Sequence, residues 1–255
     1  MNKHISDTTK IELEIPVFET PACQALTGNV FDLISDYYHH QREHSSLNKI
    51  LLDDTIRQLL SKRKYSRVLD VGCGIGTYCR MLKSYSSEII GLDTNNKMLD
   101  FARSRKDGIL YINQDFLTIE EDRKYDLIIF SLILDHVENF QTYLVKAREI
   151  LSCKGKVFCV IPNPVKDSCF QHDEFGCMLT SYFIEARQKK YRRNEKNQIF
   201  CEIFSFKRTL STYLNASIAA GLSLTNIVEP RHPDINHPAH HVPYFTILEF
   251  LNERR

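Results

Sequence analysis

The chain has 255 residues, of which 43% are hydrophobic and 25% are charged, and its formal net charge at pH 7 is +1. This length and apolar content suit one large α/β domain with a full core and a small cap. A net charge so close to zero gives no global electrostatic reason to expect nucleic acid as a partner.

The eight cysteines form no C-x-x-C pair, and the first residues contain no apolar signal core. We therefore expect reduced thiols and a cytoplasmic protein. No apolar run approaches the roughly 20 residues that a membrane-spanning helix needs, so we expect no membrane association.

The N-terminal segment is predicted to form an arm and a lid over residues 1–45. Apolar and acidic residues alternate over 11–18, which indicates either a strand or a flexible arm. The aromatic segment Phe31–Tyr38 has the pattern of an amphipathic helix. A further helix is predicted over 46–60, and the side chains expected to face a sheet are Ile50, Leu51, Ile56, Leu59 and Leu60.

Three alternating glycines follow the first buried strand. The apolar run that starts at Val68 contains the carboxylate Asp70 and breaks into Gly72-x-Gly74-x-Gly76. Glycine tolerates positive φ and lets the backbone approach a ligand closely. A phosphate-binding P-loop is excluded because no Gly-Lys-Ser/Thr follows, and Thr77 stands where the dinucleotide fingerprint has its last glycine.

A second buried strand, 89–93, ends in another carboxylate. Asp93 lies about 20 residues beyond the glycine loop, where an acidic residue meets a ribose in α/β nucleotide sites. A carboxylate can accept hydrogen bonds from both hydroxyls of a ribose diol. The next segment, Asn96–Arg103, is predicted to be an amphipathic helix.

These and the following segments resemble, in order, the class I S-adenosylmethionine methyltransferases, in particular those acting on small molecules. The segments that carry the resemblance are the glycine loop, 93–103, 111–117, 125–137 and, in part, the turn 150–158. The resemblance implies a Rossmann-like three-layer α/β sandwich with a mostly parallel seven-stranded sheet, an antiparallel last strand and a helical, aromatic cap. The predicted regions are the arm and lid (1–45), the cofactor-binding core (46–164), the cap insertion (165–207) and the C-terminal part of the core (208–255).

The same resemblance implies that the cofactor is S-adenosylmethionine and the product S-adenosylhomocysteine. Asp70 would help to bind the ammonium group and the glycine loop would pack against the methionine portion. Asp115 would bind the adenine amino group, with Phe116 beside the base. The full set of predicted cofactor residues is Tyr38, Asp70, Gly72, Cys73, Gly74, Gly76, Asp93, Thr94, Met98, Asp115, Phe116 and Ser131.

The insertion 165–207 is too long for an ordinary connection, so we expect it to have structure of its own. A helix is predicted over Cys177–Lys190 and a strand over Gln198–Phe206. Its dense aromatic residues suit a cap that excludes water from a hydrophobic acceptor. The basic run 187–193 is interpreted as a solvated face. The predicted substrate-pocket residues are Tyr37, Asn163, Tyr182 and His240.

The C-terminal part is predicted to complete the sheet. A helix begins near Lys207 with Thr209 or Ser211 as its cap, and strands follow over 224–228 and 242–250. Four histidines between these strands have no standard zinc-ligand spacing, so we expect no metal site.

Methyl transfer to oxygen or to an unactivated nitrogen also needs a base. His136 is the first candidate because it follows the fourth strand at the ligand edge of the sheet, and His241 is the second. Asp135 stands where related proteins often carry a histidine, which leaves the identity of the base open.

We therefore expect a methyltransferase for a small aromatic or hydrophobic acceptor, as a monomer or homodimer. One alternative is a methyltransferase of tRNA or protein. A second is a non-catalytic S-adenosylmethionine-binding or scaffold subunit, and an NAD-dependent oxidoreductase is the least favoured.

Overall fold

A computed structural model describes most of the chain beyond residue 46. The predicted arm and lid lie almost entirely outside it, including the segment 11–18, Tyr37 and Tyr38, so their predicted roles stay predictions. The described residues are 31–32, 35, 47–120, 122–173, 176–179, 181–193 and 199–253.

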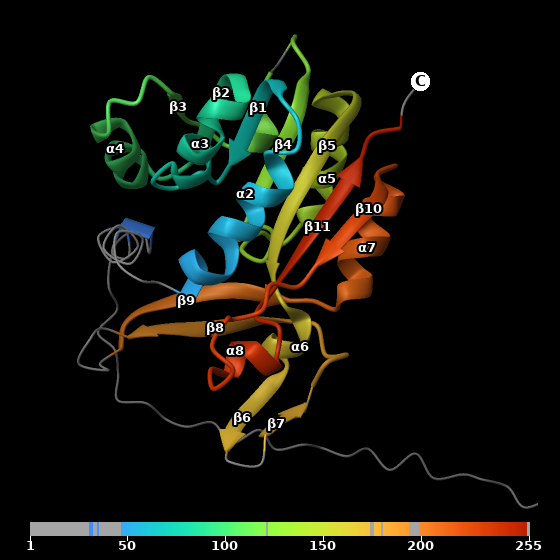
Figure 1. The fold of residues 1–255 in the computed structure, drawn as a ribbon. Helices are drawn as coiled ribbons and strands as arrows, with labels where there is room; N and C mark the ends of the chain where they lie inside the picture. The colour runs from blue at the N-terminus through green and yellow to red at the C-terminus, as the bar shows by residue number, and fades with distance from the viewer. Residues whose placement is uncertain are drawn as a thin grey trace, which may run out of the picture.

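A seven-stranded sheet forms the centre of the fold (Figure 1). All neighbouring strands are parallel except β11, which is antiparallel to both of its neighbours. This arrangement confirms the predicted α/β fold with its antiparallel last strand. In spatial order the strands are β10 (Ser223–Val228), β11 (Phe245–Leu251), β5 (Leu151–Pro162), β4 (Tyr125–Ser131), β1 (Tyr65–Val71), β2 (Ser86–Asp93) and β3 (Leu110–Asn113).

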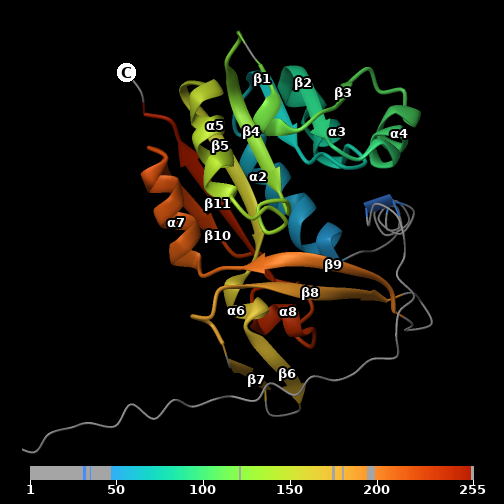
Figure 2. The ribbon, with the colours of Figure 1, turned by 180° about the vertical axis from the view of Figure 1, so that it is seen from behind.

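Helices cover both faces of this sheet, as Figures 1 and 2 show from opposite sides. Successive strand residues point to opposite faces, so Val68 packs into one hydrophobic core and Leu69 into the other. One face carries α2 (Asp54–Leu60), α3 (Thr77–Leu82) and α4 (Asn96–Ser104), and the other carries α5 (Phe140–Ile150) and α7 (Leu210–Ala219).

The predicted helix 46–60 begins with a π-helical segment, η1 (Lys49–Asp53), that runs into α2. A π-helix has more residues per turn than an α-helix, which shifts the faces of the helix. Leu51 and Leu52 are consequently both buried. Ile50, which was predicted to face the sheet, is instead 42% exposed.

The cap is built from strands, and the helix predicted over Cys177–Lys190 is wrong. Two antiparallel hairpins occupy this region. Strand β6 pairs with β7, and strand β8 pairs with β9 along its whole length. Figures 1 and 2 show the longer hairpin crossing beside one end of the sheet. The elements are α6 (Pro164–Asp167), β6 (Cys169–Asp173), β7 (Gly176–Leu179), β8 (Ala186–Arg193) and β9 (Ile199–Lys207).

The C-terminal predictions agree with the structure. Thr209 is the cap of α7, and its Oγ1 accepts a hydrogen bond from the backbone N–H of Thr212 at 3.2 Å. Three short elements complete the fold: η2 (Lys83–Tyr85), η3 (Phe116–Thr118) and α8 (Pro238–His241). Across the part of the chain that the structure describes, none of the helices has the length and apolar character needed to span a membrane.

Candidate functional site

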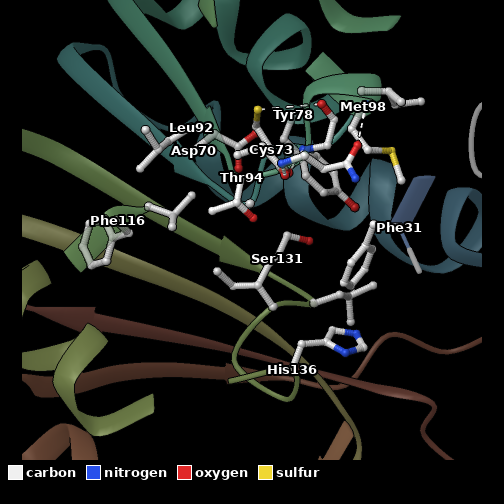
Figure 3. Close-up of a pocket in the computed structure, with 18 of the residues that line it drawn as sticks. Phe31, Asp70, Cys73, Tyr78, Leu92, Thr94, Met98, Phe116, Ser131 and His136 are labelled. Carbon is white, nitrogen blue, oxygen red and sulfur yellow. Dashed lines mark hydrogen bonds between the residues drawn. The ribbon is translucent and has the colours of Figure 1, made fainter. Parts of the chain in front are cut away.

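A cavity of about 380 Å³ lies at the carboxyl ends of β1, β2 and β4 (Figure 3). This edge of an open α/β sheet is where such folds bind nucleotide-like ligands. Ten residues predicted for the site line the cavity: Asp70, Gly72, Cys73, Gly74, Asp93, Thr94, Met98, Phe116, Ser131 and His136.

The glycine loop approaches the cavity in a conformation that other residues adopt poorly. Gly72, Gly74 and Gly76 have φ values of 68°, 52° and 74°. The backbone N–H of Gly72 donates to the carbonyl of Leu92 at 2.7 Å, which joins the loop to β2. Gly76 begins α3 and lies outside the cavity lining.

Alanine substitutions should distinguish two roles within this loop. A Cβ on Gly72 would come within 2.4 Å of Ile133 Cγ2, whereas a Cβ on Gly74 would have no atom within 4 Å. We expect Gly74→Ala to lower the free energy of unfolding by about 1–2 kcal/mol, the cost of the left-handed backbone. Gly72→Ala should cost a further 1–3 kcal/mol, roughly, from overpacking. Urea denaturation of both variants checks this order, and equal losses would contradict it.

Asp93 organises the loop and keeps acceptor capacity for a ligand. Its Oδ2 accepts the N–H of Gly74 at 2.8 Å, and its Oδ1 accepts the N–H of Asn95 at 2.8 Å. Burial raises the pKa of this carboxyl, and these hydrogen bonds oppose the shift. A carboxylate has about four lone-pair sites, so acceptor positions remain for ribose hydroxyls. The geometry therefore fits the predicted contact.

Asp70 is a buried carboxylate with an unsatisfied oxygen. It is 1% exposed, its Oδ2 accepts a hydrogen bond from Cys79 Sγ at 3.3 Å, and its Oδ1 finds no partner among the described residues. Burial, helped by the charge of Asp93, raises the pKa of Asp70 to about 7. A ligand ammonium group would supply the missing donor and favour the ionised form.

This pKa predicts that cofactor affinity depends on pH. Below pH 7 Asp70 is increasingly protonated, and binding of an ammonium group must first remove that proton. We expect the Kd of S-adenosylhomocysteine, measured by calorimetry, to rise as pH falls from 7.5 to 5.5, approaching about tenfold per unit at the acidic end. Asp70→Asn should weaken binding at pH 7.5 and flatten the dependence. A Kd that the wild-type protein keeps constant over this range would contradict the assignment.

The side of the cavity near Phe116 and Leu92 is apolar (Figure 3). The Tyr143 ring lies 5.4 Å from the Phe116 ring between centroids, and Gln114 adds an amide to the cavity lining. Asp115, predicted to bind the adenine amino group, does not line the cavity, and its Oδ1 accepts the N–H of Leu117 at the start of η3. The apolar end fits a purine ring, while the role of Asp115 stays a prediction.

His136 lies on the cavity wall beneath Phe31 and Ser131 (Figure 3). Its Nδ1 is 2.9 Å from the carbonyl oxygen of Phe204 in β9. A carbonyl only accepts, so this contact places the proton of the neutral imidazole on Nδ1 and leaves a lone pair on Nε2. The ring also contacts Phe31 edge-on, with 5.7 Å between centroids. The imidazole is therefore fixed in a form that can accept a proton.

A strained residue shapes the loop that carries His136. Leu132, the first residue after β4, has φ of 58°, a left-handed conformation that is unfavourable for a leucine. It lines the cavity, and its N–H donates to the carbonyl of Val160 in β5 at 2.9 Å. Such strain is concentrated at functional sites.

The predicted substrate-pocket residues that are described do not reach the cavity. Asn163 is buried and fully engaged: its amide nitrogen donates to Glu229 and Thr246, and its Oδ1 caps α6. The Tyr182 hydroxyl accepts the N–H of Leu210 at 3.3 Å. Both side chains hold neighbouring elements together, and their role in a substrate pocket stays a prediction.

The histidine loop is also held by its own contacts. His240 Nδ1 lies 2.7 Å from the carbonyl of His232, and His241 Nε2 lies 2.7 Å from the carbonyl of Ile235. Neither residue lines the cavity, and the predicted pocket role of His240 and catalytic role of His241 stay predictions. Within the described ranges no three His, Cys, Asp or Glu side chains gather as metal ligands would.

Several lining residues were not predicted for the site. Asn48 stands at the start of η1, and Tyr78, Gln114 and Tyr143 come from α3, the β3–η3 loop and α5. Gln114 lies within the segment 111–117, and Tyr78 closely follows the glycine loop, so both positions had a signal. Asn48 had no signal, because a π-helix cannot be recognised from hydrophobic periodicity.

The chain is similar to known methyltransferases. The model of the methyltransferase domain family matches residues 62–208. An uncharacterized protein of Haemophilus influenzae is 24% identical over 81% of this chain and 85% of its own length. A ubiquinone biosynthesis O-methyltransferase of Coxiella burnetii is 27% identical over 50% of this chain, and the match spans 57% of that enzyme.

The fold has solved counterparts. The crystal structure of an S-adenosylmethionine-dependent methyltransferase from Mesorhizobium loti superposes with a TM-score of 0.63 at 22% identity, covering 77% of this chain and 96% of that one. At this identity the likeness establishes the shared fold.

Proposed function

Because the chain belongs to the family of S-adenosylmethionine-dependent methyltransferases, we propose that it methylates a hydroxyl group of a small aromatic molecule. The observation that carries this proposal is His136, which lines the cavity and whose Nδ1 is held by the carbonyl of Phe204. A hydroxyl acceptor needs a base with a free lone pair, and Nε2 of this imidazole provides one. The O-methyltransferase activity named for the Coxiella burnetii relative supports the same acceptor atom.

In this proposal Asp70 and Asp93 bind the cofactor, and His136 activates the acceptor. Bound S-adenosylmethionine supplies a methyl group on an activated sulfonium. Asp70 and Asp93 would hold its ammonium and ribose groups, and so orient the methyl group toward the loop after β4. As the acceptor oxygen forms its bond to the methyl carbon and the sulfur–carbon bond breaks, the hydroxyl proton passes to Nε2 of His136.

The cap supports a small acceptor because it closes over the cavity. Cys201 and Ile203 on the inner face of β9 are buried and pack in one cluster with Ile75 and Met98. This contact excludes water from the neighbourhood of the cofactor.

Two of the cations of β8 whose side chains the structure describes are paired with carboxylates. Lys189 pairs with Glu202 at 3.0 Å, and Lys190 pairs with Asp167 at 2.9 Å. The guanidinium of Arg187 lies 3.9 Å from the centroid of the Phe204 ring. A nucleic-acid surface needs cations free to contact phosphates, so these pairings favour a small molecule over tRNA.

A transfer assay tests the proposal. The purified chain is incubated with methyl-labelled S-adenosylmethionine and a panel of small phenols that includes catechol, with bulk tRNA and a protein extract as parallel acceptors. We expect label in a phenol ether, and a higher Tm when that phenol is added in the presence of S-adenosylhomocysteine. Label in tRNA or protein, or cofactor binding without transfer to anything, would contradict the proposed acceptor.

A further inference from the structure

A second carboxylate with an unsatisfied oxygen lies directly behind His136. Asp135 is 4% exposed, and its Oδ1 is buried without a hydrogen-bond partner in the part of the chain that the structure describes. A buried polar group left in this state destabilises the folded protein by about 1–3 kcal/mol, and by more when it is charged. A residue with no evident structural benefit at such a cost calls for a functional explanation.

The buried guanidinium of Arg208, in the same region, is engaged by other groups. Arg208 is buried, and its nitrogens donate to the carbonyls of Leu134, Val137 and Glu138 at 2.7–2.9 Å. Its guanidinium lies 4.5 Å from the centroid of the Phe140 ring. Arg208 therefore fastens the loop backbone and stacks on aromatic rings, and among described residues it forms no ion pair with Asp135.

Two described titratable side chains interact with Asp135: Tyr213, whose pKa is raised mainly by burial and further by this carboxylate, and His136. Oδ2 of Asp135 lies 3.8 Å from Nε2 of the imidazole, the nitrogen that carries the free lone pair. The backbone of Asp135 is hydrogen-bonded to strand β9 of the cap, because its carbonyl accepts the N–H of Phe206 at 2.6 Å. The backbone contacts from β9 to both residues therefore fix the carboxylate and the ring relative to each other.

We propose that Asp135 is a positioning residue that stabilises His136 once its Nε2 has taken the acceptor proton. In that form both ring nitrogens carry a proton: Nδ1–H donates to the Phe204 carbonyl, and the Asp135 carboxylate lies 3.8 Å from the protonated Nε2 as a neighbouring negative charge. Opposite charges at this distance attract strongly because the carboxylate is shielded from water. This inference rests on the proposed function in naming the proton's source, but the pairing itself concerns only residues of this chain.

The test compares Asp135→Asn with the matched variant Glu138→Gln, which neutralises an exposed carboxylate in the same loop. Imidazole ¹⁵N NMR of His136, in the complex with S-adenosylhomocysteine at pH 6, measures the fraction of the ring that carries two protons. We expect that fraction to fall in Asp135→Asn and to stay at the wild-type value in Glu138→Gln. The Tm of Asp135→Asn should be unchanged or a few degrees higher, since a buried charge has been removed.

Kinetics with catechol as the acceptor add a second readout. We expect kcat of Asp135→Asn to fall about 10–100-fold with KM and cofactor affinity unchanged, and Asp135→Glu to restore part of the loss. A lower Tm, or an unchanged doubly protonated fraction of His136, would overturn the inference. If wild-type protein fails to methylate any phenol, the proposed acceptor is wrong, and the NMR comparison alone decides the role of Asp135.

Discussion

Replacing Asp93 by alanine is expected to weaken binding of S-adenosylhomocysteine at least about 100-fold. The substitution removes the acceptor for the ribose hydroxyls and also the two hydrogen bonds that hold the N–H groups of Gly74 and Asn95. Each hydrogen bond to a charged group contributes about 1.5–3 kcal/mol, so losing the two bonds from the ribose hydroxyls to the carboxylate accounts for this factor. Isothermal calorimetry measures the change directly.

Asp100→Ala is the matched control. Asp100 is an exposed carboxylate on the neighbouring helix α4, and its partner is Arg103 one turn along the same helix. An exposed pair of this kind contributes little, so its removal should leave the Kd within about twofold. Equal losses in both variants, or no loss in Asp93→Ala, would contradict the assignment of Asp93 to the ribose.

His136→Ala is expected to lower kcat for a phenolic acceptor by about 10²–10⁴-fold, the usual contribution of a general base. The Kd of S-adenosylhomocysteine should change less than about threefold, because the imidazole lies on the acceptor side of the cavity and is not expected to contact the cofactor. Initial rates with methyl-labelled S-adenosylmethionine and catechol give kcat, and calorimetry gives the Kd.

His240→Ala provides the comparison for this effect. His240 resembles His136 in sequence terms, as a histidine in a loop after a strand, but its ring is bonded to the His232 carbonyl outside the cavity. We expect its kcat to match the wild-type value. A loss in His240→Ala comparable with that in His136→Ala would move the base to the histidine loop, and unchanged rates in both would remove the need for a base.

The cofactor side of the site could be predicted because its signals are local. Positive φ at Gly72 requires glycine wherever the loop forms, and the carboxylates of Asp70 and Asp93 follow directly from the ends of buried strands. Parallel strands bring these ends to one edge of the sheet without further information. His136 was predicted for the same reason, since it follows β4 at that edge.

The acceptor side could not be predicted because tertiary pairing decides it. The helix predicted over Cys177–Lys190 fails because Ala186–Arg193 pairs with β9 as a strand, a contact with a segment that follows later in the chain. Asn163 sits in the expected place after β5, but its side chain turns inward to Glu229 and Thr246. Which polar residues face a cavity and which bond to one another depends on contacts between distant segments.

A crystal structure of the chain with S-adenosylhomocysteine would test the proposed site most directly. We expect that the ribose hydroxyls contact Asp93, that the amino group contacts Asp70, and that the sulfur faces His136. With room for a methyl group and an acceptor oxygen between them, sulfur and Nε2 should lie roughly 8 Å apart. A sulfur that faces away from His136, or a ribose that does not touch Asp93, would contradict the proposed site.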